Sequence, residues 1–468
     1  MRNFDCVVIG SGPGGQKAAI QAAKLGRRVC VIEKNAVLGG AAVNTGTIPS
    51  KALREAVLHL TGASKTMLFG ENARVKKQIT IDDLIYVSQR VIHHELQLVR
   101  EYFDRNNIEL IWGSAAFVSP NTVEITRGNE TEQLTADKFI LAIGTKPARP
   151  ASIPFDDKSV FCSDQLLKIG QLPKSMIVVG GGVIGTEYAC MMAALGVKVT
   201  LVEGRNEVLG FLDREVGEAL MYLMRRAGIT LRLGEKVQKI ERVEGNGTYN
   251  EPLVTATLES GKTLRAQTLL YAVGRQGTTG ALNLDKAGLA ADDRQRLHVN
   301  EHYQTAVPHI YAVGDVIGFP ALASTAMEQG RLAACHAYGV PTHSVPDLFP
   351  YGIYAIPEVS MVGKTEAQLT EAGVPYEAGI AEYRELARGQ LLGDEDGLLK
   401  LLIHQDTHEI LGVHAIGSGA TELIHIGQTA MAFKGTVEFF INNVFNYPTL
   451  AEAYKVAALN GLNKIRHV

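Results

Sequence analysis

Residues 5–34 read DCVVIGSGPGGQKAAIQAAKLGRRVCVIEK. The runs at 5–9 and 28–32, each apolar after its first residue, are typical of a buried β-strand. Between them, a glycine-rich turn leads into an alanine-rich stretch that has the composition of a helix. The stretch therefore predicts a strand, a helix and a second strand in succession, the unit from which parallel α/β sheets are built.

Three glycines in this turn, Gly10, Gly12 and Gly15, have the G-x-G-x-x-G spacing. The first permits a tight turn, the second lets the backbone approach a pyrophosphate, and the third lets the helix pack close to the strand. Free N–H groups at the start of the helix favour phosphate. Glu33 ends the second strand, where its carboxylate is placed to accept hydrogen bonds from ribose hydroxyls. Together these residues predict a dinucleotide-binding unit.

A second copy of this pattern occupies residues 176–205, MIVVGGGVIGTEYACMMAALGVKVTLVEGR. Its glycines are Gly180, Gly182 and Gly185, and its acid is Glu203. The same number of residues separates the first glycine from the acid in both copies. One such motif is weak evidence because glycine turns are common, but two copies in a full strand–helix–strand context predict two dinucleotide sites.

Further strands are predicted to end in glycine followed by a polar residue. Residues 138–150 (KFILAIGTKPARP) and 268–277 (TLLYAVGRQG) each follow a fingerprint and are interpreted as exits from the two nucleotide domains. Residues 305–315 (TAVPHIYAVGD) end in Gly-Asp. Asp315 at the carboxyl end of a strand suits a hydroxyl-rich ligand, and its alternative is a helix N-cap.

Composition limits the remaining possibilities. The chain has 468 residues, a net charge of −3, 46% apolar and 20% charged residues. That length indicates roughly two to four domains. The balanced charge argues against nucleic acid and anionic membranes as partners. The N-terminus lacks a signal-peptide pattern, and glycines and Glu187 break the most apolar window, so we expect a soluble, cytoplasmic protein.

The five cysteines form no C-x-x-C pair. They are expected to be small buried residues in a reducing compartment, and nothing in the sequence predicts a metal site. Two of them lie in strand-like and two in helix-like runs; the five are Cys6, Cys30, Cys162, Cys190 and Cys335.

The character of the chain changes at about Pro346. Strand-like runs at 356–369 and 398–417 are followed by a helical run at 426–433, without a glycine fingerprint. An alanine-rich amphipathic helix follows Pro448 near the C-terminus. We therefore expect a final α+β domain.

Two fingerprints, the IYAVGD strand and a C-terminal α+β domain resemble the two-dinucleotide-binding flavoprotein disulfide reductases over essentially the whole chain. The resemblance implies an α/β fold with two Rossmann-like domains and a C-terminal α+β dimerisation domain. It implies a discontinuous FAD domain at 1–150 and 276–345, an NAD(P) domain at 151–275 and an interface domain at 346–468 that forms a homodimer, with assembly beyond a dimer left open.

The same resemblance implies where the cofactors contact the chain. The helix from about Ser324 would point its N-terminus at the flavin pyrimidine and stabilise negative charge there. The predicted FAD contacts are Gly10, Gly12, Gly14, Gly15, Glu33, Lys34, Gly40, Thr47, Lys51, Gly144, Asp315 and Ala323. The predicted NAD(P) contacts are Gly180, Gly182, Val183, Ile184, Gly185, Glu187, Glu203, Arg205 and Gly274.

Lys51 and Glu187 match family positions that form an ion pair beside flavin N5, and they are the predicted catalytic residues. Such a pair would hold the nicotinamide face and tune the flavin electrostatically. The alternative for Lys51 alone is a solvated helix lysine. Its place in the sequence Pro-Ser-Lys at the start of a helix, together with Glu187 inside the second fingerprint, favours the functional interpretation.

The sequence departs from the family in its redox chemistry. The family motif GGxCxxxxCxPxK appears at residues 39–51 with Ala42 and Thr47 at the two cysteine positions. Neither side chain supports thiol–disulfide exchange, which needs a thiolate. The catalytic HPTxxE of the family begins here with Tyr447, and a phenol with a pKa near ~10 is a poor acid/base at neutral pH. These losses predict a scaffold that has discarded its disulfide half-reaction.

The stretches GTIPSKALR and NYPTLAEAYKVAALNGLN resemble the soluble pyridine nucleotide transhydrogenases within this family. That resemblance implies hydride transfer between NADPH and NAD⁺ through FAD. Threonine and tyrosine at these two positions are common in that subfamily, whereas Ala42 departs further. The alternatives are an NAD(P)H dehydrogenase of diaphorase type that reduces quinones or oxygen, and a non-catalytic flavin-bearing redox sensor.

Coenzyme preference is left open by two neighbouring charges. Glu203 favours NAD(H) because its carboxylate would repel a 2′-phosphate. Arg205 is placed to neutralise such a phosphate, or is an ordinary exposed arginine. Val183 stands where some family members carry a tyrosine over the flavin, and a valine leaves the nicotinamide site more open.

Overall fold

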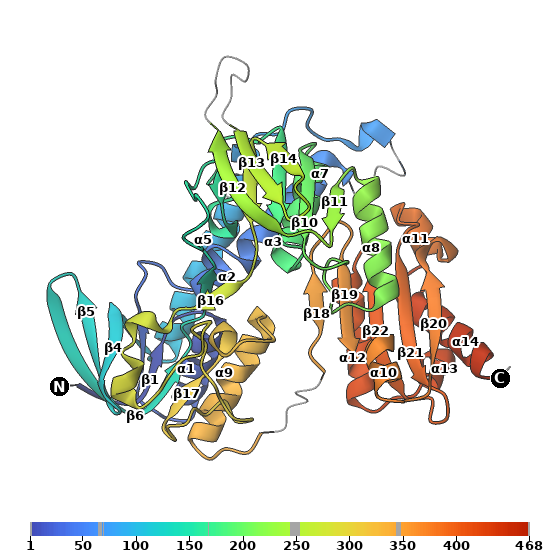
Figure 1. The fold of residues 1–468 in the computed structure, drawn as a ribbon. Helices are drawn as coiled ribbons and strands as arrows, with labels where there is room; N and C mark the ends of the chain where they lie inside the picture. The colour runs from blue at the N-terminus through green and yellow to red at the C-terminus, as the bar shows by residue number, and fades with distance from the viewer. Residues whose placement is uncertain are drawn as a thin grey trace. The chain divides into compact units, whose positions relative to one another are not determined.

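A computed structural model describes residues 2–63, 68, 70–166, 168–243, 253–342 and 348–466. The chain divides into two compact units: residues 1–53, 85–148 and 274–344 form the first, and residues 54–84, 149–273 and 345–468 form the second. Figure 1 follows the chain from its N-terminus in blue to its C-terminus in red. Three separate stretches of sequence therefore build each unit.

The first unit contains a seven-stranded sheet in which β3-β2-β1-β6-β5-β4 are ordered side by side and β17 pairs with β6. Its parallel part consists of β3 (Glu109–Trp112), β2 (Val29–Glu33), β1 (Arg2–Ile9), the end of β6 (Glu130–Leu141) and β17 (Ile310–Ala312). Its antiparallel part consists of β4 (Ser114–Ser119), β5 (Thr122–Arg127) and the start of β6.

The second half of strand β1, from Cys6 to Ile9, is apolar because both faces of the strand are buried there. Val7 and Ile9 face one core cluster, and Cys6 and Val8 face the other. The helices α1 (Pro13–Lys24) and α9 (Ala323–Ala337) supply alanines to the second cluster. They pack closely, since a Cβ on Gly330 would collide with the Gly14 carbonyl. A parallel sheet covered on both faces reads as a continuous apolar run, as predicted.

The second fingerprint lies in the second unit, in a five-stranded parallel sheet with the order β11-β10-β9-β15-β8. A three-stranded antiparallel sheet, β12-β13-β14, follows it. The bounds are β8 (Val160–Phe161), β9 (Ser175–Val179), α7 (Val183–Ala194), β10 (Lys198–Glu203), α8 (Arg214–Arg226), β11 (Thr230–Leu233), β12 (Val237–Val243), β13 (Leu253–Leu258), β14 (Thr263–Ala266) and β15 (Thr268–Tyr271).

The C-terminal part of the second unit is an antiparallel sheet with the order β18-β19-β22-β21-β20. Helices α12 and α14 pack on it around a core that includes Tyr454 and Phe440. The bounds are β18 (Tyr351–Ile353), β19 (Val359–Gly363), α10 (Glu366–Glu371), β20 (Tyr376–Glu382), η6 (Tyr383–Glu385), α11 (Ala387–Leu392), β21 (Leu398–His404), β22 (Ile410–Ile416), α12 (Ala420–Ala432), α13 (Glu438–Asn442) and α14 (Glu452–Arg466).

The remaining elements lie outside these three main sheets and the three-stranded one. In the first unit, β7 and β16 pair antiparallel. The remaining bounds are α2 (Gly40–Asn44), α3 (Thr47–Thr61), η2 (Gly70–Ala73), α5 (Ile81–Arg105), β7 (Thr145–Pro147), α6 (Ser163–Leu166), β16 (Arg275–Gly277), η3 (Thr279–Ala281), η4 (Leu284–Ala287) and η5 (Gly314–Ile317).

The five cysteines are buried and unpaired, as predicted. Burial raises the pKa of Cys6 and Cys30 to about 12 and that of Cys190 to about 11. These side chains are therefore protonated thiols at neutral pH, without the thiolate character that redox chemistry needs.

Two further expectations concern the whole chain. No helix among the described residues combines the length and apolarity that a membrane crossing requires. The predicted boundary near Pro346 lies outside the described residues, and the division into three domains stays a prediction.

Candidate functional site

The turn between β1 and α1 has the shape that the first fingerprint predicts. Gly10 has a φ of +102°, a conformation that favours glycine. A Cβ on Gly15 would collide with the Gly10 carbonyl, so the helix approaches the strand closely there. Gly12 is the N-cap of α1, and no side chain caps this end. The first N–H groups of α1 are thus left for an anion.

Glu33 is buried at the end of β2 and is held by the same turn. Its Oε2 accepts hydrogen bonds from Ser11 N at 3.0 Å and Ser11 Oγ at 2.6 Å. Its Oε1 accepts from Asn35 N at 2.8 Å. Two carboxylate oxygens offer about four acceptor positions. The fixed carboxylate therefore keeps acceptor capacity for a ribose hydroxyl.

The sulfur-free motif begins beside this turn. Ser11 Oγ accepts a hydrogen bond from Gly39 N at 3.1 Å. A Cβ on Gly40 would press on Gly12 Cα, so these two glycine backbones lie against each other. Ala42 is in the short helix α2, and exposed Thr47 is the first residue of α3. The motif thus starts next to the predicted phosphate loop, and the family's two cysteine positions lie on either side of the turn between α2 and α3.

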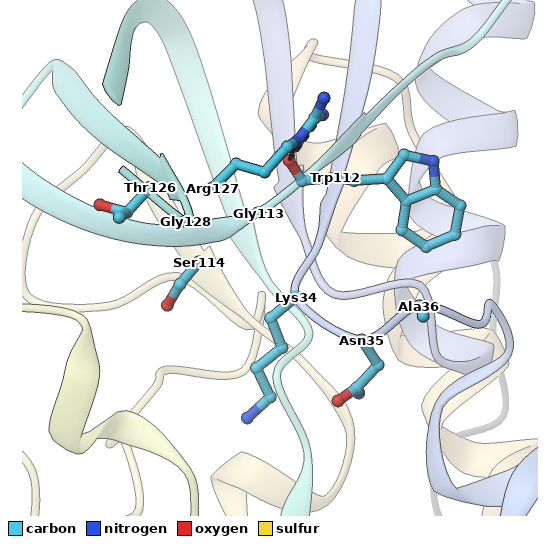
Figure 2. Close-up of a pocket in the computed structure, with 9 residues that line it drawn as sticks. All are labelled: Lys34, Asn35, Ala36, Trp112, Gly113, Ser114, Thr126, Arg127 and Gly128. Carbon is cyan, nitrogen blue, oxygen red and sulfur yellow. Dashed lines mark hydrogen bonds between the residues drawn. The ribbon is translucent and has the colours of Figure 1, made fainter. Parts of the chain in front are cut away.

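A cavity of about 520 Å³ opens next to Glu33, at the carboxyl ends of β2 and β3. Figure 2 shows Lys34 and Asn35 in the lower part of this view, and Arg127 above them beside the indole of Trp112. Arg127 donates to the Trp112 carbonyl from Nε at 3.0 Å and Nη2 at 2.8 Å. The lining residues are Lys34, Asn35, Ala36, Trp112, Gly113, Ser114, Thr126, Arg127 and Gly128. Ligands of open α/β sheets bind at this edge.

Asp315 lies within η5, whose N-cap position is Val313, so helix capping does not explain its carboxylate. Thr145 Oγ1 donates to Asp315 Oδ2 at 3.0 Å, and Arg275 Nε lies 3.9 Å from the same oxygen. Arg275 also donates to Thr145 Oγ1 at 2.7 Å. Among the described residues, no donor reaches Asp315 Oδ1, which leaves that oxygen for a hydroxyl-bearing ligand.

The second fingerprint repeats the geometry of the first. Gly180 has a φ of +108°, and a Cβ on Gly185 would collide with the Gly180 carbonyl. Gly182 is the N-cap of α7, again without a side-chain cap, and a Cβ there would meet nothing within 4 Å. Val183 and Ile184 are half-buried in the first turn of α7. The two turns are therefore built alike, as the matched spacing predicts.

Arg205 donates hydrogen bonds to Glu203, the acidic residue of this second site. Glu203 accepts from Gly181 N at 2.6 Å, Arg205 N at 2.9 Å and Arg205 Nε at 2.9 Å. Burial acts to raise the pKa of Glu203, but the hydrogen bonds from Arg205 and Gly181 outweigh it, and its pKa lies below the usual value. The hydrogen bond to Glu203 raises the pKa of Arg205. Both groups are therefore charged at neutral pH.

The two predicted catalytic residues belong to different units. Lys51, half-buried on α3, donates to Ser50 Oγ at 3.3 Å. Glu187, only 3% exposed on α7, accepts from Tyr354 N at 2.8 Å. Because the two residues lie in separate units, the ion pair between Lys51 and Glu187 stays a prediction.

The remaining predicted contacts lie at turns and helix starts. Gly144 has a φ of +65° in the first unit, and Ala323 is the first residue of α9, whose N-terminus has no side-chain cap. Gly14 packs against α9. Gly274, with a φ of +81°, falls in the first unit, whereas the other predicted NAD(P) residues lie in the second. Its grouping with them stays a prediction.

Several residues of these sites were not predicted as site residues from the sequence. Ser11 links Glu33 to Gly39, and Thr145 and Arg275 surround Asp315. Ser11 is the variable residue inside G-x-G, where the motif itself gives no signal. Thr145 and Arg275 each follow the glycine that ends a predicted strand, and that shared position was the available signal.

Residues 4–330 match the model of a family described as pyridine nucleotide-disulphide oxidoreductase, and residues 349–458 match the dimerisation domain of that family. The chain belongs to this family. The resemblance predicted from the motifs is therefore confirmed, and with it the fold class of two nucleotide-binding parts followed by a dimerisation domain.

Relatives with high identity share one name. Soluble pyridine nucleotide transhydrogenase of Mycobacterium tuberculosis is 53% identical over 468 residues, covering 100% of this chain and 98% of that protein. The protein of the same name from Photobacterium profundum is 45% identical, covering 99% of this chain and 98% of its own length. The predicted resemblance to this subfamily is thus confirmed.

Solved structures of the family share the fold. LpdA from Mycobacterium tuberculosis has a TM-score of 0.88 at 25% identity and covers 98% of this chain and 99% of its own. The Cu(II) complex of RclA from Escherichia coli, an HOCl-induced flavoprotein disulfide reductase, has a TM-score of 0.85 at 26% identity with the same coverage. Both are similar to this chain along nearly its full length.

Proposed function

We propose that this chain is an FAD-dependent enzyme that transfers hydride between NADPH and NAD⁺, the activity named in its 45–53% identical relatives. One observation carries the proposal. Both nucleotide-binding turns keep their fingerprint geometry, while Ala42, Thr47 and Tyr447 stand where the disulfide chemistry of the family needs two thiols and an imidazole. The retained half of the machinery handles nicotinamides and flavin, and the missing half handled disulfides.

The residues present fit the two expected cofactors, FAD in the first unit and NAD(P)(H) in the second. Each fingerprint offers an uncapped helix N-terminus to a pyrophosphate and a carboxylate at the next strand end to a ribose. Asp315 has an unused oxygen for a hydroxyl-bearing chain, and the cavity beside Lys34 is placed for the adenosine end. Bound FAD supplies the chemistry, because it accepts a hydride from one nicotinamide and returns it to another.

The protein's part in such a reaction is orientation and electrostatics. We assign Glu187 to the nicotinamide side, where its burial and its hydrogen bond from Tyr354 hold the carboxylate in one place. Lys51 is assigned to the flavin side, as the resemblance implies. Hydride transfer needs no protein nucleophile, and holding both partners in reacting geometry accounts for much of the acceleration of such steps.

The ion pair between Arg205 and Glu203 supports the use of both coenzymes. With NADH, the exposed Arg205 side chain would turn aside, so that a Glu203 oxygen accepts from the ribose 2′-OH. With NADPH, Arg205 offsets the charge that would repel the 2′-phosphate, and its exposed guanidinium is free to turn toward the phosphate. The site therefore discriminates against NADPH less strongly than a site with Glu203 alone would.

We place the enzyme in the cytoplasm as a homodimer formed through the C-terminal domain. The match to a dimerisation domain and the exposed apolar side chains around residues 433–447 support the dimer. Five thiols kept reduced and buried suit a reducing compartment. The predicted domain ranges, 1–150 with 276–345, 151–275 and 346–468, are retained as part of this proposal.

A steady-state assay tests the function. Purified holoenzyme is given NADPH with an NAD⁺ analogue whose reduced form absorbs at its own wavelength, and in parallel NADPH with a quinone or with oxygen. We expect reduction of the analogue to be the fastest reaction. Quinone or oxygen reduction faster by orders of magnitude would assign the chain to the diaphorase class, and no turnover with any acceptor would favour a redox sensor.

A further inference from the structure

Arg54 is a buried arginine with no assigned role. It lies on α3, and its side chain is 5% exposed. Its Nε donates to the Ala355 carbonyl at 2.9 Å, and its Nη1 lies 3.3 Å from Glu358 Oε1 and 2.8 Å from Glu55 Oε1. Two of these three partners belong to residues 354–358, hereafter the strap. A guanidinium buried to this degree is rare unless its donors are used.

The strap also holds Glu187. Tyr354 N donates to Glu187 Oε1 at 2.8 Å, and the Ala355 carbonyl accepts from Arg54 at 2.9 Å. These two groups belong to adjacent residues, so fixing one restricts the other, because the backbone has two soft dihedrals per residue. Arg54 therefore restrains the stretch of backbone that orients the Glu187 carboxylate.

The last residue of the strap, Glu358, is anchored to the start of α12. Glu358 Oε2 accepts from Thr421 N at 3.2 Å and from Thr421 Oγ1 at 2.7 Å, at the first turn of α12. The Glu358 carbonyl accepts from Gly417 N at 2.9 Å. Arg54 thus contacts the strap at Ala355 and Glu358, while Thr421 and Gly417 hold Glu358 from the other side.

The geometry suits arginine and excludes a simple replacement. A planar guanidinium directs Nε to one partner and Nη1 to another at a fixed angle, whereas a lysine ammonium is a single point charge. The Arg54 guanidinium also lies 5.9 Å from the centre of the Tyr354 ring, within reach of a cation–π contact. A lysine here would keep the charge next to Glu358 and lose the bond to Ala355.

We infer that Arg54 is a positioning residue for Glu187, acting through the strap. The inference rests on the role that the proposed function gives Glu187 in placing the nicotinamide. Arg54 itself contacts neither the coenzyme nor the reacting atoms in this account. Its task is to keep the Tyr354 N–H aimed at the Glu187 carboxylate.

Arg54→Lys tests this inference in the holoenzyme with two measurements. Hydrogen–deuterium exchange should become faster, by about tenfold or more, in the peptide that contains Tyr354, because its amide loses a fixed acceptor. In stopped-flow mixing with NADPH, the rate of flavin bleaching should fall by about tenfold to a hundredfold, since small misplacements slow such steps this much. The NADPH concentration for half-maximal rate should change by less than about threefold, because Glu187 orients the coenzyme more than it binds it.

Controls separate positioning from a general loss of structure. Glu55→Ala removes the exposed partner of Arg54, whose side chain is 66% exposed, and should leave both measurements at wild-type values. Glu187→Gln should slow bleaching, and adding Arg54→Lys to it should cause no further loss. Should Arg54→Lys fail to retain FAD, Glu358→Gln replaces it, and faster exchange at Tyr354 is again expected.

Unchanged exchange at Tyr354, or fully additive losses in the double variant, would overturn the inference. The proposed function is judged separately. If wild-type enzyme is bleached by NADPH yet does not pass electrons to NAD⁺, transhydrogenation fails, while the exchange and bleaching results still report on Arg54.

Discussion

Glu203 and Arg205 are the two neighbouring residues proposed to set coenzyme choice. The guanidinium donates to the carboxylate through Nε at 2.9 Å and Nη2 at 3.4 Å, and the Gly181 amide donates from the other side. The acid is half-buried and the arginine is exposed. The sequence left open whether Arg205 was an ordinary surface residue, and the structure gives it a partner inside the predicted ribose site.

Arg205→Ala should therefore reduce use of NADPH more than use of NADH. Without the guanidinium, the Glu203 charge repels a 2′-phosphate and no donor replaces it. We expect the ratio of kcat/KM for NADPH over NADH to fall by about tenfold, the equivalent of one charge-assisted hydrogen bond. Steady-state kinetics with both coenzymes measures it. The matched control is Arg214→Ala, which removes an exposed arginine–glutamate pair on α8, and equal losses for both coenzymes in Arg205→Ala would refute the assignment.

At the scale of elements, one buried lysine joins helix α8 to the C-terminal sheet. Lys400, on β21, is fully buried and its Nζ lies 2.8 Å from Asp213 Oδ1 and 2.9 Å from Glu215 Oε2, with Glu366 as a third partner. Asp213 is the N-cap residue of α8. Burial acts to raise the pKa of Asp213, but Lys400 outweighs it and the pKa is lowered. Three partners raise the pKa of Lys400 despite its burial.

Lys400→Met should destabilise the protein in a pH-dependent way. At pH 7 it leaves the buried Asp213 carboxylate unpaired, which costs about 3–5 kcal/mol. Because the folded pKa of Asp213 is depressed, the stabilisation is complete above its unfolded value of about 3.9 and is lost as pH falls through the folded pKa. The difference in thermal midpoint between variant and wild type should thus shrink as pH is lowered from 7 toward 3.

The control for this prediction is Arg226→Met, which removes the exposed pair of Arg226 and Asp396. Exposed pairs contribute about 0–1 kcal/mol, so its midpoint should stay close to wild type at every pH. A Lys400→Met protein that melts like the control at pH 7 would contradict the role given to the cluster.

The elements predicted from sequence are those whose signals are local. The two fingerprints are short, and their first and third glycines have the predicted turn and close-packing geometry because turn geometry depends on adjacent residues. Strand β6 was anticipated only from about Lys138, yet it begins at Glu130, because its first half pairs with β5 in a hairpin that the motifs did not indicate. Runs of apolar residues indicate buried strands, and the more exposed first half of β6 has no such run.

Long-range contacts could not be predicted from the sequence, for a different reason. The bond from Arg54 to Ala355 joins residues 301 apart, and that from Lys400 to Asp213 joins residues 187 apart. Only folding brings such groups together, so each alone looked like an ordinary charged residue. The predicted pair of Lys51 and Glu187 came from the family resemblance and could not have been found from spacing.

At the scale of the whole molecule, an apolar surface marks the dimerisation domain. Phe433 is 84% exposed and Val444 is 93% exposed, and Phe439 and Tyr447 are exposed on the same stretch of chain. Apolar side chains exposed along one stretch of chain in this way are typical of an interface. Tyr447, at the family's histidine position, belongs to this stretch, where the family resemblance places it across the dimer.

Val444→Asp should weaken the dimer. Burying an unpaired carboxylate in an interface is unfavourable by several kcal/mol, so dissociation should appear at micromolar concentrations where wild type stays dimeric. Sedimentation velocity over a dilution series measures it. Val243→Asp, at an exposed valine of the nucleotide-binding part, is the control. A Val444→Asp protein with the same dimer stability as wild type would place the interface elsewhere.

The central claim is that the flavin–nicotinamide half of the family's chemistry is retained and the disulfide half is gone. Anaerobic titration of the holoenzyme with dithionite, followed by absorbance, tests it most directly. We expect uptake of two electrons per FAD, with no long-wavelength thiolate-to-flavin band at any point, because Ala42 and Thr47 hold no sulfur. Uptake of four electrons per FAD with such a band would contradict it.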